Sequence, residues 1–308
     1  MNTSSSEYHV PVLLNDCVDA LQVEEGGIFV DVTFGGGGHS KVIFDKLPEG
    51  KLIVFDQDPD ARPYAADFES DAKRSFVFVP ANFRYLKQYL KFHKATQVDG
   101  ILADLGVSSH QFDTGARGFS TRFEGLLDMR MDQASELDAR KVVGTYDEKD
   151  LMHMFSYYGD IRNARTLAKA IVQARQIEEI QTTDQLLKIA QAIAPRGKHA
   201  KYFAQIFQAI RIVVNDEVGA LEDMLTDCVE MLKPGGRLVV MSYHSLEDRL
   251  VKSLINTGNL KGMVEKDFYG NLIRPLEPVN RKPIIPSEEE IAVNSRARSA
   301  KLRVAIKQ

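Results

Sequence analysis

The chain has 308 residues, 44% of them hydrophobic, and a formal net charge of −4 at pH 7. The length favours two domains, or one domain with a large insertion, and the composition provides enough apolar side chains for a sizeable core. The net charge excludes a protein whose whole surface is basic. No apolar run approaches the ~20 residues of a membrane-spanning helix, so no membrane partner is expected.

Two features indicate a protein of the reducing cytoplasm. The N-terminal segment MNTSSSEYHV has neither the basic start nor the apolar run of an export signal. Cys17 and Cys228 are too few and too far apart in the sequence for a disulfide framework. We therefore expect a cytoplasmic localisation.

Basic residues are concentrated near the C-terminus. Segment 291–308 contains no acidic residue but several basic ones: Arg296, Arg298, Lys301, Arg303 and Lys307. Because the chain as a whole is acidic, a polyanionic partner would be bound locally, at such a cluster.

The first third of the chain alternates between two patterns. Short apolar runs predict buried strands at 28–33, 51–56, 75–79 and 98–105, and the segments between them predict helices at 39–47, 59–71 and 82–93. Strands that alternate with helices are typical of a parallel, doubly wound α/β sheet. This is the fold class that we predict.

The next part of the chain lacks strand patterns. Three helical segments follow one another, and Thr145 with Glu148 and Thr182 with Gln185 resemble capping boxes that would begin two of them. From Tyr202 to residue 232 the apolar spacing predicts one long helix. RLVVMSY at 237–243 then predicts a fifth strand, SLEDRLVKSLI a helix and AKLRVAI at 300–306 a closing strand. The helical block is therefore interpreted as an insertion into a single sheet domain.

The segment VDVTFGGGGHSKVI at 30–43 places four consecutive glycines between a predicted strand and a predicted helix. Such a turn lets backbone N–H groups and the first turn of the helix approach a ligand, because no Cβ atom blocks the way. Asp56 ends the second strand about 20 residues beyond the glycines, where a carboxylate can bind ribose hydroxyls. Dinucleotides and S-adenosylmethionine both contain such a ribose.

Three details favour S-adenosylmethionine. Asp31 places negative charge beside the glycines, which suits a sulfonium and an amino group and would repel a pyrophosphate. LKPGGRLVV at 232–240 has the helix-to-strand turn that often precedes the fifth strand of methyltransferases that use this cofactor. DGILADLGVSS at 99–109 places Asp104 at the carboxyl end of the fourth strand, where open parallel sheets position ligands.

Several uncommon motifs extend this picture over almost the whole chain. They are HVPVLL (9–14), TFGGGGHS (33–40), FDQDP (55–59), DGILADLGVSSHQ (99–111), RGFS (117–120), LDMRMD (127–132), FQAIRIVVNDE (207–217), SYHSLEDRLVK (242–252) and SRARSAKLR (295–303). In these motifs the chain resembles the RsmH (MraW) family, methyltransferases that methylate the exocyclic N4 of a cytidine in the decoding centre of 16S ribosomal RNA.

The resemblance implies a Rossmann-like methyltransferase sheet that binds S-adenosylmethionine, with an inserted all-helical domain. We place the methyltransferase domain at 1–112 and 201–308, and the inserted substrate-recognition domain at 113–200. The cofactor contacts that the resemblance implies are Gly37, Gly38, His39, Asp56, Phe83, Asp104 and Gln111. The implied partner is 16S rRNA, in the small ribosomal subunit or a late assembly intermediate, in a bacterial cytoplasm. No DNA partner and no metal site are expected, and a homodimer is left open.

The sequence departs from the family pattern in two places. Before the predicted long helix, HAKYFAQIFQA at 199–209 lacks the Pro, the Thr and the Arg of the family's HPATRTFQA. Lys198 and Lys201 supply positive charge nearby. Leu126 stands where the family usually has Pro, a change that we expect to alter only a turn.

The catalytic candidates are Asp104, Ser108 and His244. Cytosine N4 is a poor nucleophile because its lone pair is delocalised into the ring, so positioning must supply much of the rate. Asp104 would lie near the reacting amine or the cofactor, with Ser108 and Ser109 as hydroxyl partners, unless the serines only cap a helix. His244 could accept a proton late in the reaction or serve only as a structural hydrogen-bonding group. Glu247 and Asp248 are interpreted as first-turn helix acids.

The RNA-binding candidates are Lys198, Lys201, Arg296, Arg298, Lys301 and Arg303. They would contact phosphates, unless the C-terminal basic residues are only a solvated face. Phe83 and Tyr243 could stack on an unstacked base, although core packing would explain them equally.

Two other functions remain open at this stage. An NAD-dependent Rossmann oxidoreductase would use the same glycine loop and Asp56, but the sequence shows no clear substrate acid–base pair. A non-catalytic RNA-binding factor of ribosome assembly could keep the fold with a decayed pocket, yet Gly37, Asp56 and Asp104 are all intact.

Overall fold

The computed structural model describes residues 11–71 and 74–308. The segment MNTSSSEYHV, and with it the first two residues of the motif at 9–14, lies outside the described residues. The chain divides into a sheet unit, Met1–Gly106 with Gly219–Gln308, and a helical unit, Val107–Val218. Among the described residues, no helix combines the length and apolar character needed to cross a bilayer.

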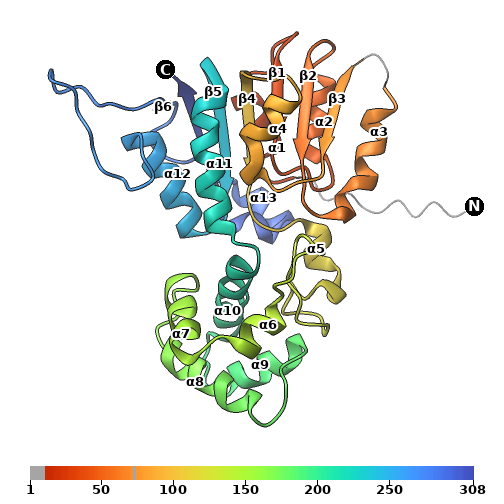
Figure 1. Cartoon of the computed structure of the whole chain (residues 1–308), viewed down its shortest axis with the longest axis vertical. Coiled ribbons are helices and arrows are strands. Elements are labelled where there is room, and N and C mark those ends of the chain that lie inside the picture. The colour runs from red at the N-terminus through yellow and green to blue at the C-terminus, as the bar shows by residue number, and fades with distance from the viewer. Residues whose placement is uncertain (1–10, 72–73) are drawn as a thin grey trace, which may run out of the picture. The chain divides into compact units, whose positions relative to one another are not determined.

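The sheet unit contains one seven-stranded sheet with the strand order β3-β2-β1-β4-β5-β7-β6 (Figure 1). The strands are β1 Ile28–Asp31, β2 Lys51–Phe55, β3 Ser75–Val79, β4 Val98–Asp104, β5 Leu232–Ser242, β6 Leu276–Pro278 and β7 Lys301–Lys307. The pairings from β3 to β5 are parallel, and β7 is antiparallel to both of its neighbours. The predicted doubly wound sheet is confirmed, whereas the short β6 was not predicted.

Successive side chains of the central strands point to opposite faces of this sheet, and both faces are buried. Leu52 and Val54 belong to a core cluster that also contains residues of α1 and α2, such as Ile43. Ile53 and Phe55 are equally buried and point to the opposite face, where the Phe55 ring meets Tyr89 of α4. Strands buried on both faces explain the nearly continuous apolar runs of the sequence.

The helices of the sheet unit agree with the predicted positions and add α1 and α13. They are α1 Leu14–Leu21, α2 Gly38–Asp45, η1 Pro59–Ala65, α3 Ala66–Glu69, η2 Phe83–Tyr85, α4 Leu86–Phe92, α12 Ser245–Thr257, α13 Glu288–Val293 and η4 Ser295–Ser299. The helix α11 Glu217–Met231 begins in the last two residues of the helical unit and continues in the sheet unit. On one face α4 and α11 are joined, because Asp227 Oδ2 accepts the Lys87 N–H at 2.9 Å. Cys17 and Cys228 are both buried free thiols, which agrees with the absence of a disulfide framework.

The helical unit has its own core, built around residues such as Leu151, Phe155, Leu167 and Ile210. Its helices are α5 Ser109–Asp113, η3 Gly115–Arg117, α6 Ala139–Thr145, α7 Glu148–Tyr157, α8 Ala164–Arg175, α9 Thr183–Gln191 and α10 His199–Val214. Because α10 packs against α6, α7 and α9, the unit extends beyond the range 113–200 that the sequence indicates. Leu126, where the family usually has Pro, is exposed and forms an isolated bridge with Thr182.

The single long helix predicted from residue 202 to residue 232 is wrong. The chain breaks after α10, where Asp216 adopts a left-handed conformation with φ 46°. The Asn215 side chain donates to the carbonyls of Met129 and Arg211 and accepts the Met131 N–H at 2.7 Å. An Asn side chain that competes for backbone groups in this way ends a helix although the apolar stripe continues.

One of the two predicted capping boxes is confirmed and the other is wrong. Thr182 caps α9, and its Oγ1 accepts the Gln185 N–H while the Gln185 side chain accepts the Thr182 N–H. Thr145 instead ends α6, where its hydroxyl donates to the Lys141 carbonyl. Asp147 is the residue that caps α7. The helix begins two residues later than the Thr–Glu spacing suggested because Asp is an equally good cap.

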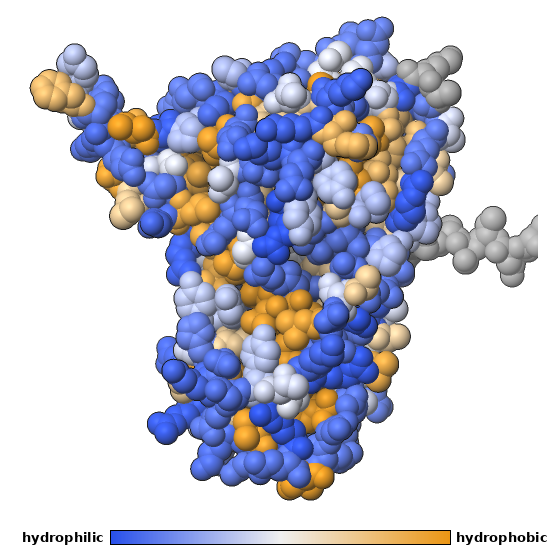
Figure 2. Space-filling view, in the orientation of Figure 1, coloured by the Kyte–Doolittle hydropathy of each residue, from blue (hydrophilic) through white to orange (hydrophobic). Residues whose placement is uncertain are grey.

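A hairpin around the bridge between Lys266 and Leu272 projects from the sheet unit and carries apolar side chains near its end (Figure 2). The side chains of Phe268 and Tyr269 are 97% and 86% exposed. Asp267 orders the turn, because its Oδ1 accepts the N–H groups of Tyr269 and Asn271. The hairpin is therefore held by its own hydrogen bonds rather than by packing of these rings.

The two capping predictions can be compared directly. Replacing Thr182 by Ala should lower the free energy of unfolding of the helical unit by about 1 kcal/mol, because α9 loses a side-chain cap. Thr145→Ala serves as the matched control and should change it by well under that amount, since an exposed Thr that bonds back to the preceding turn contributes little. Urea denaturation of both variants measures the difference. Equal effects would contradict the assigned caps.

Candidate active site

The four glycines form the turn between β1 and α2. Gly37 is the residue before α2 and has φ 80°, a conformation that a side chain would strain. A Cβ atom on Gly38 would overlap the ring of Pro11. The segment therefore needs glycine at both positions, and it places the first N–H groups of α2 beside the carboxyl end of β1.

Asp31, at the end of β1, holds this loop in place by hydrogen bonds. Its carboxylate is 1% exposed and accepts the Ser40 hydroxyl at 2.6 Å and the Thr33 N–H at 3.0 Å. The Thr33 hydroxyl oxygen in turn accepts the Asp104 N–H at 2.7 Å, which links the loop to the end of β4. Because both Asp31 oxygens bond to the loop and the side chain is buried, Asp31 can influence a ligand only through the loop and through its charge.

Asp56 follows β2 and is joined to the same loop. One carboxylate oxygen accepts the Gly35 N–H at 2.7 Å and the other accepts the Asp58 N–H at 2.8 Å. Burial raises the pKa of Asp56 to about 6, although both N–H groups act in the opposite direction. Each oxygen keeps a further lone pair that can accept a hydroxyl group.

Asp104 ends β4, beside the loop. Its Oδ1 accepts the Tyr243 hydroxyl at 2.8 Å, and its Oδ2 lies 3.7 Å from Nδ1 of His39. Burial raises the pKa of Asp104 to about 6, whereas His39 and the Tyr243 hydroxyl favour the ionised form. The side chain is 24% exposed, so this carboxylate remains accessible to a ligand.

His39 supplies an unsatisfied polar atom at the same edge. The side chain is 6% exposed, and within the described part of the chain its Nε2 has no hydrogen-bond partner. A buried nitrogen without a partner costs free energy unless a ligand or water satisfies it.

Phe83 begins η2 just after β3 and is half-buried.

Taken together, Asp31, Asp56 and Asp104 concentrate negative charge where three parallel strands end. Such an edge favours a cationic ligand and disfavours a pyrophosphate. The two accessible carboxylates, the unpartnered His39 nitrogen and the start of α2 beside them fit a ligand with a ribose and a cationic amino acid part, which is the chemistry of S-adenosylmethionine.

Ser108 and Gln111 lie in the helical unit and form a capping box at α5. Ser108 Oγ accepts the Gln111 N–H at 3.2 Å, and the Gln111 side chain accepts the Ser108 N–H at 3.0 Å. Gln111 is 4% exposed. Ser108 therefore does cap a helix, and its hydroxyl hydrogen can still be donated to another group.

His244 has the structural position that the sequence left open. It caps α12, its Nδ1 accepts the Glu247 N–H at 3.5 Å, and Glu247 Oε2 accepts the Tyr243 and His244 N–H groups. Its Nε2 lies 3.1 Å from Glu247 Oε1. Glu247 and Asp248 are confirmed as acids of the first turn.

The basic candidates have different surroundings. Arg303 and Lys301 form ion pairs of 2.7 and 3.1 Å with Asp248, so part of their charge is neutralised. Arg298 is exposed, Arg296 is half-buried, and Lys198 and Lys201 are exposed on the helical unit. The pairing with Asp248 was missed because 53 residues separate Asp248 from Lys301. The bond from Tyr243 to Asp104 was missed for the same reason.

A doubly wound sheet with a glycine loop after β1 and carboxylates after β2 and β4 defines an α/β enzyme that binds a nucleoside cofactor at the carboxyl edge of its strands. The family model described as "MraW methylase family" matches residues 6–308. The chain is 52% identical over 304 residues to the ribosomal RNA small subunit methyltransferase H of Amoebophilus asiaticus, covering 99% of this chain and 97% of that one. It is 50% identical over 309 residues to the protein of the same name from Bacteroides thetaiotaomicron, with full coverage of both chains.

The chain therefore belongs to the MraW methylase family, and it is a methyltransferase whose methyl donor is S-adenosylmethionine. The predicted methyltransferase fold is confirmed. A solved rRNA methylase from Streptococcus thermophilus aligns with 96% of this chain and 93% of that one, at 12% identity and a TM-score of 0.41, a likeness too weak to bear on function.

The bond between Tyr243 and Asp104 predicts a measurable pKa change. A hydroxyl that donates to a carboxylate stabilises the ionised form, so Tyr243→Phe should raise the pKa of Asp104 further above about 6. A carboxyl-carbon NMR titration measures this directly. Tyr89→Phe, on the opposite face of the sheet, is the control and should leave the pKa unchanged. An unaltered pKa in the Tyr243 variant would show that the bond is absent in solution.

Proposed function

We propose that this chain methylates the exocyclic N4 of a cytidine in the decoding centre of 16S rRNA. The two relatives described above are named as methyltransferases of small-subunit ribosomal RNA, and the chain covers 97% and 100% of their lengths. The observation that carries the proposal is Asp104, an accessible carboxylate with a pKa of about 6 beside the cofactor loop. The target is the RNA of the small subunit or of a late assembly intermediate, in the cytoplasm.

For the cofactor, the proposal assigns contacts by chemistry. Asp56 accepts the ribose hydroxyls with its remaining lone pairs, and the backbone at Gly37 and Gly38 approaches the amino acid part. His39 Nε2 gains the partner that it lacks. Phe83 packs against the adenine, and the resemblance implies a further contact from Gln111. When bound, S-adenosylmethionine supplies an electrophilic methyl group.

Asp104 is the proposed catalytic carboxylate. Cytosine N4 carries two hydrogens and a lone pair that is delocalised into the ring. A carboxylate that accepts one N–H orients the amine and favours localisation of the lone pair for attack. Tyr243, by donating to Oδ1, fixes the carboxylate so that Oδ2 faces the base. The proton is lost from N4 as the new bond forms, and an acceptor with a pKa near neutrality suits this step.

His244 and Ser108 have weaker support as catalytic groups. Both are engaged in helix caps, and His244 Nε2 lies 3.1 Å from Glu247 Oε1. The proposal keeps His244 as a later acceptor of the proton and Ser108 as a hydroxyl donor. Loss of either side chain should therefore reduce turnover less than loss of Asp104.

RNA binding is assigned to basic side chains of both units, of which Lys198, Lys201 and Arg298 are exposed. Lys198 and Lys201 belong to the helical unit, whose proposed role is substrate recognition, and Arg296, Arg298, Lys301 and Arg303 belong to the sheet unit. Membership of a methylase family removes the support for an oxidoreductase. A non-catalytic assembly factor would have no need for the intact loop and the carboxylates of the site.

The proposed activity is tested with small ribosomal subunits that lack the modification. Incubation with isotopically labelled S-adenosylmethionine, followed by nucleoside mass spectrometry, should give labelled N4-methylcytidine. Asp104→Asn should reduce the rate by about 10²-fold or more while the protein still folds. Asp67→Asn, an exposed change on α3, is the control and should be as active as the wild type. Label on another atom or nucleoside, or no transfer at all, would overturn the proposal.

Cofactor affinity should depend on pH in a defined direction. The folded-state pKa values of Asp56 and Asp104 are both about 6, so protonation on the acid side removes acceptors for the cofactor. Affinity for S-adenosylmethionine should therefore be highest above that pH and fall as pH drops through it. At neutral pH, Asp56→Asn should weaken binding by about 1.5–3 kcal/mol.

The same variant also tests which group titrates. Because an amide does not ionise in this range, the acid-side loss of affinity should be less steep in Asp56→Asn than in the wild type. Isothermal titration calorimetry at several pH values gives both quantities. A variant with wild-type affinity and the same pH dependence would mean that Asp56 does not contact the cofactor.

A further inference from the structure

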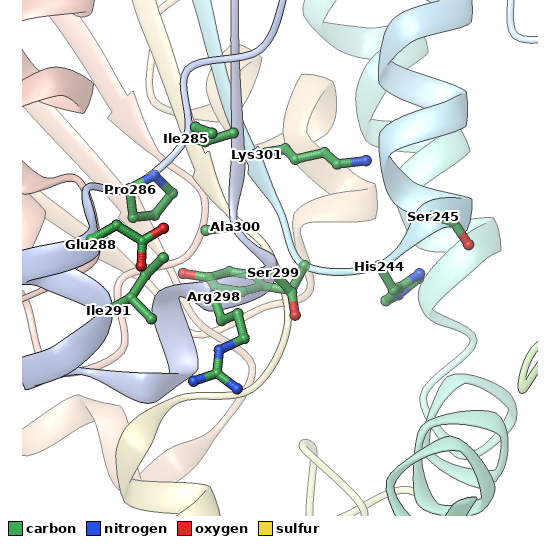
Figure 3. Close-up of a pocket in the computed structure, with 11 residues that line it drawn as sticks. His244, Ser245, Ile285, Pro286, Glu288, Ile291, Arg298, Ser299, Ala300 and Lys301 are labelled. Atoms are coloured by element: carbon green, nitrogen blue, oxygen red, sulfur yellow. The ribbon is translucent and has the colours of Figure 1, made fainter. Parts of the chain in front are cut away.

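A pocket of about 490 Å³ lies in the sheet unit beyond the end of β5 and the start of β7. Figure 3 shows its walls, with Ile285 and Ile291 on one side and Arg298 and Lys301 among the polar groups. None of the residues assigned to the cofactor lines it. Its size falls within the range of ligand-binding pockets.

The lining combines two kinds of surface. Tyr243, Ile285 and Ile291 offer an apolar and aromatic wall that suits the flat face of a base. Arg298 is exposed, and within the described residues no ion pair or hydrogen bond of its guanidinium is found. Lys301 is already paired with Asp248, which leaves Arg298 as the cation best able to bind an anion. Arginine binds a phosphate with two parallel hydrogen bonds.

Tyr243 connects the pocket to the reaction site. Its side chain lines the pocket, and its hydroxyl donates to Asp104 at 2.8 Å. In the sheet order β5 alone separates β4 from β7, so the pocket lies about two strand spacings, or ~10 Å, from the end of β4. A base at Asp104 would fill the reaction site and leave this pocket for the adjoining part of the RNA.

We propose that this pocket binds a single-stranded nucleotide that neighbours the methylated cytidine, with its base against Tyr243, Ile285 and Ile291 and its phosphate on Arg298. The inference rests on the proposed function, because it takes RNA as the substrate. The pocket selects for an unstacked, flexible RNA segment, since a base held in a duplex cannot enter it.

The charges of the pocket limit what it accepts. Glu288 also lines it, and Lys301 is partly neutralised, so the pocket does not attract a multiply charged anion. One phosphate bound at Arg298 suits the combined charge of Glu288, Arg298 and Lys301. Glu288 can accept hydrogen bonds from the amino or hydroxyl groups of the nucleotide. A single nucleotide of the chain therefore fits better than a triphosphate.

Two variants test the pocket in the full-length protein. Arg298→Gln removes the proposed phosphate contact, and Ser299→Trp places a large side chain at the pocket lining without a change of charge. Arg281→Gln, an exposed change of the same kind in the C-terminal part of the chain, is the matched control. The probes are a single-stranded RNA trinucleotide with a central cytidine, and cytidine alone, each titrated in the presence of S-adenosylhomocysteine.

Both pocket variants should weaken trinucleotide binding about tenfold, with cytidine binding unchanged. In Arg298→Gln the slope of log affinity against log salt should also fall by about 0.7, the value for one phosphate of a single strand. If Arg298→Gln and Arg281→Gln have equal effects, or if Ser299→Trp binds the trinucleotide like the wild type, the inference is wrong.

Methyl transfer to small subunits separates this inference from the function on which it rests. If the wild type is active and both pocket variants have the same KM and the same trinucleotide affinity as the wild type, the pocket inference fails and the proposed function stands. If the wild type transfers no methyl group while the trinucleotide effects appear as described, the proposed function fails and the pocket remains an RNA site.

Discussion

The inward-facing carboxylate of Asp31 is the constraint on which the site depends. It accepts the hydroxyl of Ser40 and the N–H of Thr33, and so fixes both ends of a glycine loop that has few side chains of its own for support. Asp56 joins the middle of the loop to β2 through Gly35. Thr33 joins it to Asp104 on β4. Three strands that are far apart in sequence are thus joined at one edge, because the carboxylates of Asp31 and Asp56 bond to the backbone of the loop between β1 and α2.

This arrangement also explains the electrostatics of the site. Burial of a carboxylate costs free energy, and the raised pKa values of Asp56 and Asp104 reflect mainly that cost, with a smaller contribution from the charge of Asp31. A cationic cofactor offsets it, so the same groups that hold the loop favour S-adenosylmethionine. Accessible carboxylates with raised pKa values in a ligand-binding edge are typical of sites that transfer protons. In the proposed function Asp104 takes part in both cofactor binding and the reaction, and Tyr243, which donates to Asp104, also lines the neighbouring pocket.

The sequence predicted the parts of this structure that depend on local patterns. The strands, the glycine turn and the place of Asp56 follow from period, residue type and spacing, and the capping box at Thr182 follows from a four-residue motif. Prediction from the sequence failed where residues that are distant in the sequence bond to one another. Asn215 ends α10 by bonding to Met129 and Met131, which no periodicity can reveal. The pairing of Arg303 with Asp248, the Tyr243 bond and the pocket depend on strand order, because β7 inserts between β5 and β6.

The central claim is that the edge formed by β1, β2 and β4 holds the methyl donor with Asp104 at the point of transfer. A crystal structure of the full chain with S-adenosylhomocysteine tests this most directly. We expect ribose hydroxyls on the Asp56 carboxylate, His39 Nε2 bonded to the ligand and the sulfur on the side of Asp104. A ligand bound at another edge of the sheet, or one that leaves Asp56 without a ribose contact, would contradict it.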